Sequence, residues 1–271
     1  MSDLFTLKNK TIVVTGSTGV LGGSFITAIA QAGGQLVLLG RNIEVAETRA
    51  HAICAKGGKA IALKADVLKE DELSKACAKA TDVYGSIDGL VNAAGGNLPG
   101  AVVDPSADLF SLDMEALKNV VELNLMGTVL PTQVFGKTIA ASGGGSIVNI
   151  SSVSASRALT RVLGYSLAKA GVEAYTKWMA VELANRYKDS IRINAMVPGF
   201  FLTEQNKQLL TTESGEFTPR AQKIIQQTPY GRLGTPSELE GGLIWLLSDA
   251  SKFVSGTTIT IDGAFSAFSG V

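Results

Sequence analysis

Short apolar runs alternate with longer amphipathic segments along the whole chain. Seven runs rich in β-branched and aliphatic residues have the length of strands, and most of the segments between them have the apolar spacing of helices. The strand-like runs are 11–15, 35–39, 59–64, 88–92, 146–150, 190–197 and 257–262. This alternation predicts an α/β fold in which one doubly wound, parallel, seven-stranded sheet is flanked by helices on both faces.

Length and charge indicate a single domain that acts on a small molecule. A chain of 271 residues with zero formal net charge fits one α/β domain over 1–271, and nothing in it suggests binding to nucleic acid or to an anionic membrane. Cys54 and Cys77 both lie in helix-like segments, so we expect neither a disulfide nor a metal site. The chain shows no leader-like start and no apolar run of membrane length, which predicts a cytoplasmic protein.

The first strand ends in a glycine-rich turn that leads directly into a helix. Glycines there allow the backbone to approach a pyrophosphate, and the helix N-terminus offers it unpaired amides. The turn therefore predicts a dinucleotide site in a Rossmann fold, with a tight turn that binds nothing as the alternative. The residues of this predicted site are Gly16, Ser17, Thr18, Gly19, Val20, Leu21 and Gly22.

The second strand ends at the position where a Rossmann fold recognises the adenosine ribose. Gly40-Arg41-Asn42 stands there, whereas NAD-binding chains often place an acidic residue that bonds the ribose 2′-hydroxyl. Because a guanidinium can pair with a 2′-phosphate, Arg41 with its neighbour Asn42 slightly favours NADP. Arginine can also stack on adenine, so NAD remains open as the cofactor.

Tyr165 and Lys169 are candidates for proton transfer. They are four residues apart in a run of good helix formers, so their side chains share one helix face. A phenol titrates near pH ~10, and a neighbouring ammonium, helped by a positive nicotinamide ring, would lower that pKa. Ser152 would hold the substrate oxygen against the phenol. The pair alone fits a solvated helix face equally well, but a single histidine, His51, rules out a Ser–His–Asp triad.

The order of these motifs resembles the short-chain dehydrogenase/reductase family over essentially the whole chain. The motifs are the Thr15-Gly16 turn, Asn92-Ala-Ala-Gly95, Asn124, the spacing Ser152–Tyr165–Lys169 and Pro198-Gly199. One departure is that a glycine falls at Gly19 where the family more often has it at position 20. The resemblance implies that Asn124, Ser152, Tyr165 and Lys169 are catalytic. It also implies that Asn124 kinks its helix and holds a water linked to Lys169.

The resemblance assigns further cofactor contacts at the strand ends. It implies that Asp66 bonds the adenine amino group, that Asn92 ties neighbouring strands together, and that the Thr203 hydroxyl holds the nicotinamide carboxamide. The implied contacts, with Tyr165 and Lys169, are Asp66, Val67, Asn92, Ala93, Ala94, Gly95, Pro198, Gly199 and Thr203. In the family, the helices of Asn124 and Tyr165 pack against their copies, which implies a homotetramer.

These features predict an NAD(P)-dependent oxidoreductase that interconverts a secondary alcohol and a ketone. Polar and basic residues around the catalytic segment, and in a substrate lid at about 200–230, suit a sugar acid. The candidate substrate residues are Asn97, Ser152, Arg157, Arg161, Gln205 and Arg220. Stretches such as 94–99 and 198–206 resemble the D-mannonate oxidoreductase (fructuronate reductase) branch. Alternatives are a reductase of another polyol, neutral sugar or acyl-thioester ketone, and a non-catalytic nucleotide-binding regulator.

Overall fold

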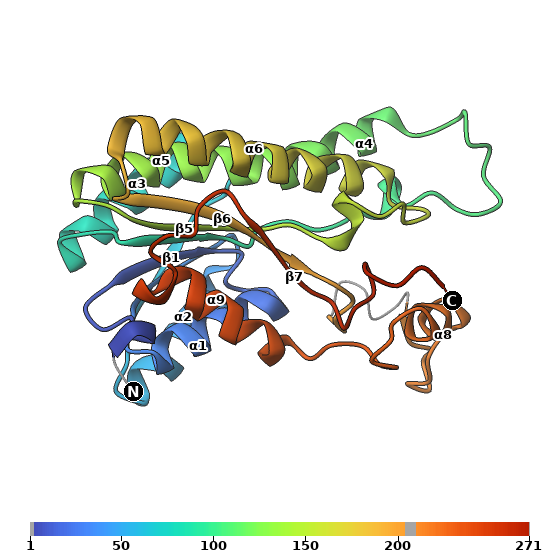
Figure 1. Ribbon diagram of the computed structural model, residues 1–271, viewed down its shortest axis with the longest axis horizontal. Helices are drawn as coiled ribbons and strands as arrows, with labels where there is room; N and C mark the ends of the chain where they lie inside the picture. The colour runs from blue at the N-terminus through green and yellow to red at the C-terminus, as the bar shows by residue number, and fades with distance from the viewer. Residues whose placement is uncertain (1–2, 204–209, 271) are drawn as a thin grey trace.

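A computed structural model describes residues 3–203 and 210–270 (Figure 1). The described residues form a seven-stranded parallel sheet in the order β3-β2-β1-β4-β5-β6-β7. The strands are β1 (Thr11–Thr15), β2 (Gln35–Gly40), β3 (Lys59–Lys64), β4 (Gly89–Asn92), β5 (Gly145–Ile150), β6 (Ile191–Pro198) and β7 (Thr258–Ile261). The strand order reverses between β1 and β4, so their carboxyl ends flank the crevice where such sheets bind ligands. The predicted fold class is confirmed.

Helices cover both faces of the sheet, as the alternating pattern predicts (Figure 1). One layer holds α1 (Val20–Gln31), α2 (Ile43–Ala55) and α9 (Glu240–Leu247). The other holds α3 (Glu70–Tyr84), α4 (Met114–Val121), α5 (Gly127–Ala141) and α6 (Leu163–Tyr187). Along β1, Ile12 and Val14 face the first layer and Val13 faces the second, and all three are fully buried. Burial on both faces explains why the strands are apolar throughout.

The helical segment that carries Asn124 is interrupted in its middle. Residues Glu122–Met126 form a π-helical turn between α4 and α5, and the buried Asn124 lies within it. Such single-turn insertions occur frequently at functional sites, because the wider turn redirects a side chain. The irregularity predicted at Asn124 is therefore present as a π turn.

The predicted lid is only partly described. Its helix α8 (Pro219–Gln226) lies apart from both helical layers, near the carboxyl ends of β6 and β7 (Figure 1). The candidate Gln205 falls within 204–209, outside the described residues.

Three features are absent from the described part of the chain: a disulfide, a membrane-spanning helix and a metal-binding group. Cys54 is exposed and Cys77 is buried, and neither forms a disulfide. No described helix is both long and apolar enough to cross a bilayer. Among the described residues, no group of three or more His, Cys, Asp or Glu side chains is placed to hold a metal ion.

Candidate active site

Ser152, Tyr165 and Lys169 lie together at the carboxyl end of β5. The first turns of α6 carry Tyr165 and Lys169 on one face, with the lysine Nζ 5.4 Å from the centre of the phenol ring. Lys169 is 4% exposed and donates to the carbonyl oxygen of Ile150 at 2.7 Å. The hydroxyls of Tyr165 and Ser152 are hydrogen-bonded to each other. Lys169 is therefore buried and Tyr165 half-buried, which excludes the interpretation as a solvated helix face.

Burial dominates the electrostatics of this group. It raises the pKa of the Tyr165 phenol above its usual range, while the hydrogen bond with Ser152 lowers it. Burial also lowers the pKa of Lys169 to about 8. The sequence predicts that Lys169 lowers the tyrosine pKa, but in the protein alone desolvation of the phenolate outweighs that attraction. Lowering the tyrosine pKa therefore requires a further positive charge beside the ring.

Asn124 joins the same site through the backbone of Gly96. Its Oδ1 accepts from the Gly96 amide at 2.8 Å, and its Nδ2 donates to the carbonyls of Gly96 and Val120, each at 2.8 Å. A Cβ placed on Gly95 would lie 2.5 Å from Asn124 Oδ1 and 3.5 Å from Lys169 Nζ. The π turn thus brings the asparagine beside the lysine, although these three hydrogen bonds of its side chain all go to backbone atoms.

A cavity of about 210 Å³ lies at the carboxyl ends of β1, β2 and β4. Glycines and small residues make most of its wall. The lining residues are Gly16, Thr18, Gly19, Leu39, Gly40, Arg41, Ala65, Asp66, Val67, Ala93, Ala94, Gly95 and Leu123. The structure therefore brings together nine of the residues predicted to bind a cofactor, from four separate segments of the chain.

The backbone around this cavity leaves room only for glycine at several positions. Gly16 has a φ of 64°, and a Cβ on it would lie 2.6 Å from the carbonyl oxygen of Ala93. A Cβ on Gly22 would lie 2.2 Å from the Gly16 oxygen, whereas one on Gly19 would make an ordinary 3.4 Å contact. Gly19 caps α1 without a side chain, so the helix end is open to a ligand. This cradle fits a dinucleotide pyrophosphate.

Several predicted cofactor residues also have contacts within the protein scaffold, and their contact with a cofactor stays a prediction. The buried Ser17 hydroxyl donates to the Leu39 carbonyl, and the Asn42 side chain caps α2 by accepting from the Val45 amide. Val20 and Leu21 form the first turn of α1. The Asn92 amide donates to Asn149 at 2.9 Å and to Thr132 at 2.8 Å, which confirms that it ties neighbouring elements together.

The turn after β6 is held against the end of β7. The Gly199 amide donates to the Ile261 carbonyl at 2.9 Å, and a Cβ on Gly199 would lie 2.6 Å from the Asp262 side chain. Pro198 is the last residue of β6, and the half-buried Thr203 follows in the same loop. The close approach explains the glycine at 199, while the contact of Thr203 with nicotinamide stays a prediction.

A larger cavity of about 820 Å³ lies between the loop at 103–109, the entry to α6 and α8. Three cations line it, Arg161, Arg220 and Lys223, against one carboxylate, Asp104. Arg220 reaches Thr160 with both terminal nitrogens at 3.4 Å. Burial and then repulsion from Arg161 lower the pKa of Arg220, so the two guanidinium groups lie close together. Ser152 and Tyr165 are not among the lining residues.

Two other substrate candidates, Arg157 and Asn97, are not among the residues that line this cavity. Arg157 is exposed and lines a neighbouring cavity of about 480 Å³, which Arg161 also borders. The Oδ1 atom of Asn97 is buried with no hydrogen-bond partner among the described residues. An unpaired buried acceptor next to the Gly96–Asn124 bonds is suited to a ligand donor.

Comparison with known proteins agrees with this geometry. A family model described as enoyl-(acyl carrier protein) reductase matches residues 20–266. UxuB of Bacillus subtilis, an uncharacterised oxidoreductase, is 40% identical over 274 residues covering 98% of each chain. The chain belongs to the short-chain dehydrogenase/reductase family.

Two solved structures of this family show related architecture with different cofactors. A candidate D-mannonate oxidoreductase from Haemophilus influenzae, with bound NAD, has a TM-score of 0.90 at 39% identity, covering 98% of both chains. A gluconate 5-dehydrogenase from Burkholderia cenocepacia, in complex with NADP and tartrate, has a TM-score of 0.87 at 31% identity, again covering 98% of both chains. The chain is an NAD(P)-dependent oxidoreductase of this family. Like other enzymes of the family, it acts on a small molecule.

Three residues of the short-chain dehydrogenase/reductase site were missed by the sequence analysis. The Thr15 hydroxyl accepts from the amides of Ala93 and Ala94, each at 3.1 Å, and so fixes one wall of the cofactor cavity. Arg49 of α2 donates to carbonyls of the glycine turn, and Lys223 lines the cationic cavity. A β-branched hydroxyl at a strand end was a usable signal for Thr15. Nothing in the pattern separates Arg49 or Lys223 from ordinary surface cations.

Proposed function

We propose that this enzyme interconverts a secondary alcohol and a ketone on a sugar acid of the D-mannonate/D-fructuronate kind. The observation that carries the proposal is the meeting of Arg161, Arg220 and Lys223 in one cavity beside the entry to α6. A guanidinium holds a carboxylate through two parallel hydrogen bonds, which fix its orientation as well as its position. The names of the Haemophilus and Burkholderia relatives, a mannonate and a gluconate enzyme, support the same substrate class.

The proton chemistry is assigned to Tyr165. Its Oη gives a proton to the ketone oxygen in reduction and takes it back in oxidation, while Ser152 holds that oxygen through its own hydroxyl. The nicotinamide supplies or accepts the hydride when the cofactor is bound. Lys169 and a positive ring on the other side of the phenol together offset the burial that raises the tyrosine pKa.

Asn124 and Lys169 form the proposed route for the proton from Tyr165 to solvent. Both are buried and both adjoin Gly95, so a water between them would have donors and acceptors on two sides. A regulator that only binds nucleotide would not need this buried arrangement. Burying the Lys169 ammonium is unfavourable in free energy, as its lowered pKa shows. That cost favours catalysis over the regulatory alternative.

The choice between NAD and NADP rests on Arg41. It is exposed and lines the cofactor cavity, as do Gly40 and Asp66. From that position its guanidinium could pair with a ribose 2′-phosphate, which supports the slight preference for NADP. One of the two solved relatives binds NAD and the other binds NADP, so the relatives favour neither cofactor over the other.

A homotetramer and a cytoplasmic location remain part of the proposal. The outward face of α6 exposes large apolar side chains, with Leu167 53%, Trp178 61% and Val181 60% exposed. An apolar helix face of this kind supports packing against a second copy of the chain. Two unpaired cysteines suit a reducing compartment.

The substrate assignment is tested with Arg161→Met and Arg220→Met. Removing the true partner of the carboxylate should lower kcat/KM on fructuronate or mannonate by an amount that corresponds to about 2–5 kcal/mol of lost transition-state stabilisation. The reason is that the substrate charge loses its partner in a closed site. The same variants should change kcat/KM little on a neutral ketose of equal length. Arg186→Met, a surface change at the far end of α6, is the matched control.

Either of two results would refute the sugar-acid assignment. One is wild-type kcat/KM on the acidic substrates in Arg157→Met, Arg161→Met and Arg220→Met alike. The other is a wild-type preference for the neutral ketose. The general assignment as a reductase would survive both results.

A further inference from the structure

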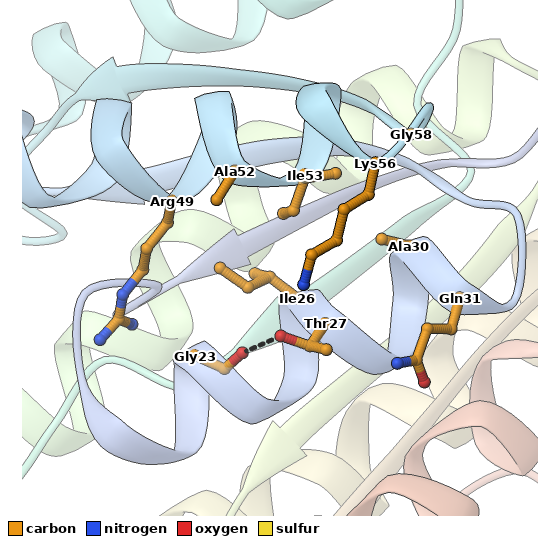
Figure 2. A pocket seen from close by; sticks show the side chains of 10 residues that line it. All are labelled: Gly23, Ile26, Thr27, Ala30, Gln31, Arg49, Ala52, Ile53, Lys56 and Gly58. Carbon is orange, nitrogen blue, oxygen red and sulfur yellow. Dashed lines mark hydrogen bonds between the residues drawn. The ribbon is translucent and has the colours of Figure 1, made fainter.

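Arg49 connects α2 to the glycine turn of the cofactor cavity. Its Nη1 donates to the carbonyl oxygen of Ser17 at 2.5 Å and to that of Gly19 at 2.7 Å. Figure 2 shows the side chain leaving α2 and reaching across a groove toward the turn that precedes α1. Burial lowers the pKa of Arg49, so this cation is partly withdrawn from water to make the contact. The two carbonyls belong to the glycine turn, whose residues Gly16, Thr18 and Gly19 line the cofactor cavity.

Gly23 makes room for the guanidinium. A Cβ placed on Gly23 would lie 2.8 Å from Arg49 Nη1 and 3.1 Å from its Cζ. Because both contacts involve the far end of a flexible side chain, an alanine at 23 would push the guanidinium away rather than disturb the backbone. Glycine in the interior of a helix otherwise lowers helix stability relative to alanine, so its presence in the first turn of α1 is accounted for by this contact.

Besides Arg49, a backbone donor holds one of the two turn carbonyls that Arg49 contacts: the Gly23 amide donates to the Gly19 carbonyl at 2.9 Å. The Ser17 amide and hydroxyl both bond the Leu39 carbonyl, and the Gly19 amide bonds the Gly16 carbonyl. Those contacts fix the two ends of the turn to β2 and to itself. Arg49 alone reaches the Ser17 carbonyl in the described structure, and a peptide plane fixed at its oxygen is fixed at the next amide too. The guanidinium thereby sets the direction of the Thr18 amide, and it shares with the Gly23 amide the restraint on the Gly19–Val20 peptide.

We infer that Arg49 is a positioning residue for the cofactor: it orients the amides of the glycine turn toward the pyrophosphate without contacting the cofactor itself. The inference rests on the proposed position of the pyrophosphate at the turn. Since the pyrophosphate is common to both nicotinamide cofactors, Arg49 should contribute equally to the binding of NADH and NADPH. That equality distinguishes it from Arg41, whose proposed contact exists only with the 2′-phosphate of NADPH.

The test measures cofactor Kd by calorimetry and apo-enzyme Tm for Arg49→Met and Gly23→Ala. Each variant should raise the Kd for NADH and the Kd for NADPH by about tenfold or more. A loss of this size is expected when hydrogen bonds made by a charged donor are removed. Gly23→Ala should do so with an unchanged or raised Tm, because alanine favours the helix. In an Arg49→Met background, Gly23→Ala should cause no further loss, since its target is gone. The value of kcat at saturating cofactor should stay within about twofold of wild type.

Lys56→Met is the matched control. Lys56 is the C-cap residue of α2 and lines the same groove of about 420 Å³, and it forms no described bond to the glycine turn (Figure 2). It should leave both Kd values unchanged, which separates positioning from the mere presence of positive charge. Arg49→Lys, which keeps the charge but loses the planar fork, should recover only part of the affinity.

Three results would overturn the inference. Kd values of Arg49→Met within twofold of wild type would do so, as would an equal loss in Lys56→Met. A fall in Tm that accounts for the loss of affinity would show a structural role only. Gly16→Ala distinguishes failure of the underlying assignment: if it too leaves cofactor affinity unchanged, the pyrophosphate does not lie at the turn.

Discussion

The cofactor cavity is walled by backbone, whereas the cationic cavity beside α6 is walled by long side chains. Around the first, Gly16 and Gly22 lie too close to main-chain atoms for a Cβ, and a Cβ on Gly40 would lie 2.9 Å from the Thr18 side chain. In the second, Arg161, Arg220 and Lys223 reach the cavity through flexible stems from α8 and the loop before α6. A backbone wall cannot adapt, but long side chains can change rotamer.

This difference suits the two ligands. A nicotinamide cofactor is the same molecule in every reaction cycle, so a rigid wall avoids the entropy lost in ordering side chains. A substrate that is bound and released at each turnover is better met by groups that rearrange. The comparison predicts that substitutions on the cofactor side act through sterics and change binding, while those on the substrate side act through charge and change specificity.

The largest effect is expected at the proposed proton donor, Tyr165. Tyr165→Phe removes the transferable proton but keeps the ring, so kcat should fall about 10³-fold while cofactor Kd changes little. Single-turnover assays and calorimetry give the two values. Retention of more than about a tenth of wild-type kcat, a loss under ~1.4 kcal/mol, would show that another group donates the proton.

The rigid wall is tested by a pair of glycine substitutions. Gly16→Ala combines a positive φ with a contact at 2.6 Å to backbone, so it should cost about 1–3 kcal/mol in stability and abolish measurable cofactor affinity. Gly19→Ala meets only a 3.4 Å contact at a φ of −75°, and should bind cofactor nearly as wild type does. Thermal unfolding and calorimetry on both proteins would check this. Equal losses in the two variants would remove the steric basis of the comparison.

Buried charge at Lys169 predicts a pH-dependent stability. Its pKa is about 8 in the folded protein and near 10.5 when unfolded, so the folded state bears the cost of a buried cation below pH 8. That cost is relieved between pH 8 and 10.5, where only the unfolded state stays protonated. The stability of Lys169→Met relative to wild type should therefore drop by roughly 3 kcal/mol from pH 7 to above 10. Denaturant unfolding of the apo proteins measures it, and a constant difference would contradict the low pKa.

The smallest effect is expected at the exposed rim. Arg41→Ala should raise KM for NADPH by about tenfold and leave KM for NADH nearly unchanged, since an exposed charge pair contributes about 1 kcal/mol. Steady-state kinetics with the two cofactors suffices. Equal changes in both KM values would mean that Arg41 does not read the 2′-phosphate, and NAD would become the preferred cofactor.

Sequence reasoning reached the parts of the molecule that depend on local pattern. The strand runs, the glycine turn and the four-residue spacing of Tyr165 and Lys169 each carry their structure in neighbouring residues. Contacts between distant elements were out of reach. Arg49 lies 30 positions from Gly19, and its role depends on how α2 packs against α1. The direction of the Tyr165 pKa also required burial, which spacing alone does not give.

The π turn at Glu122–Met126 has a consequence for the length of this chain. A π turn holds one more residue than an α turn, so α4 and α5 can be regarded as a single helix with one residue inserted. Deleting one residue there would leave a regular helix of ordinary length, and would rotate the remaining side chains by about 100° relative to their neighbours. The shortened protein should fold, yet it would turn the amide now beside Lys169 toward a different helix.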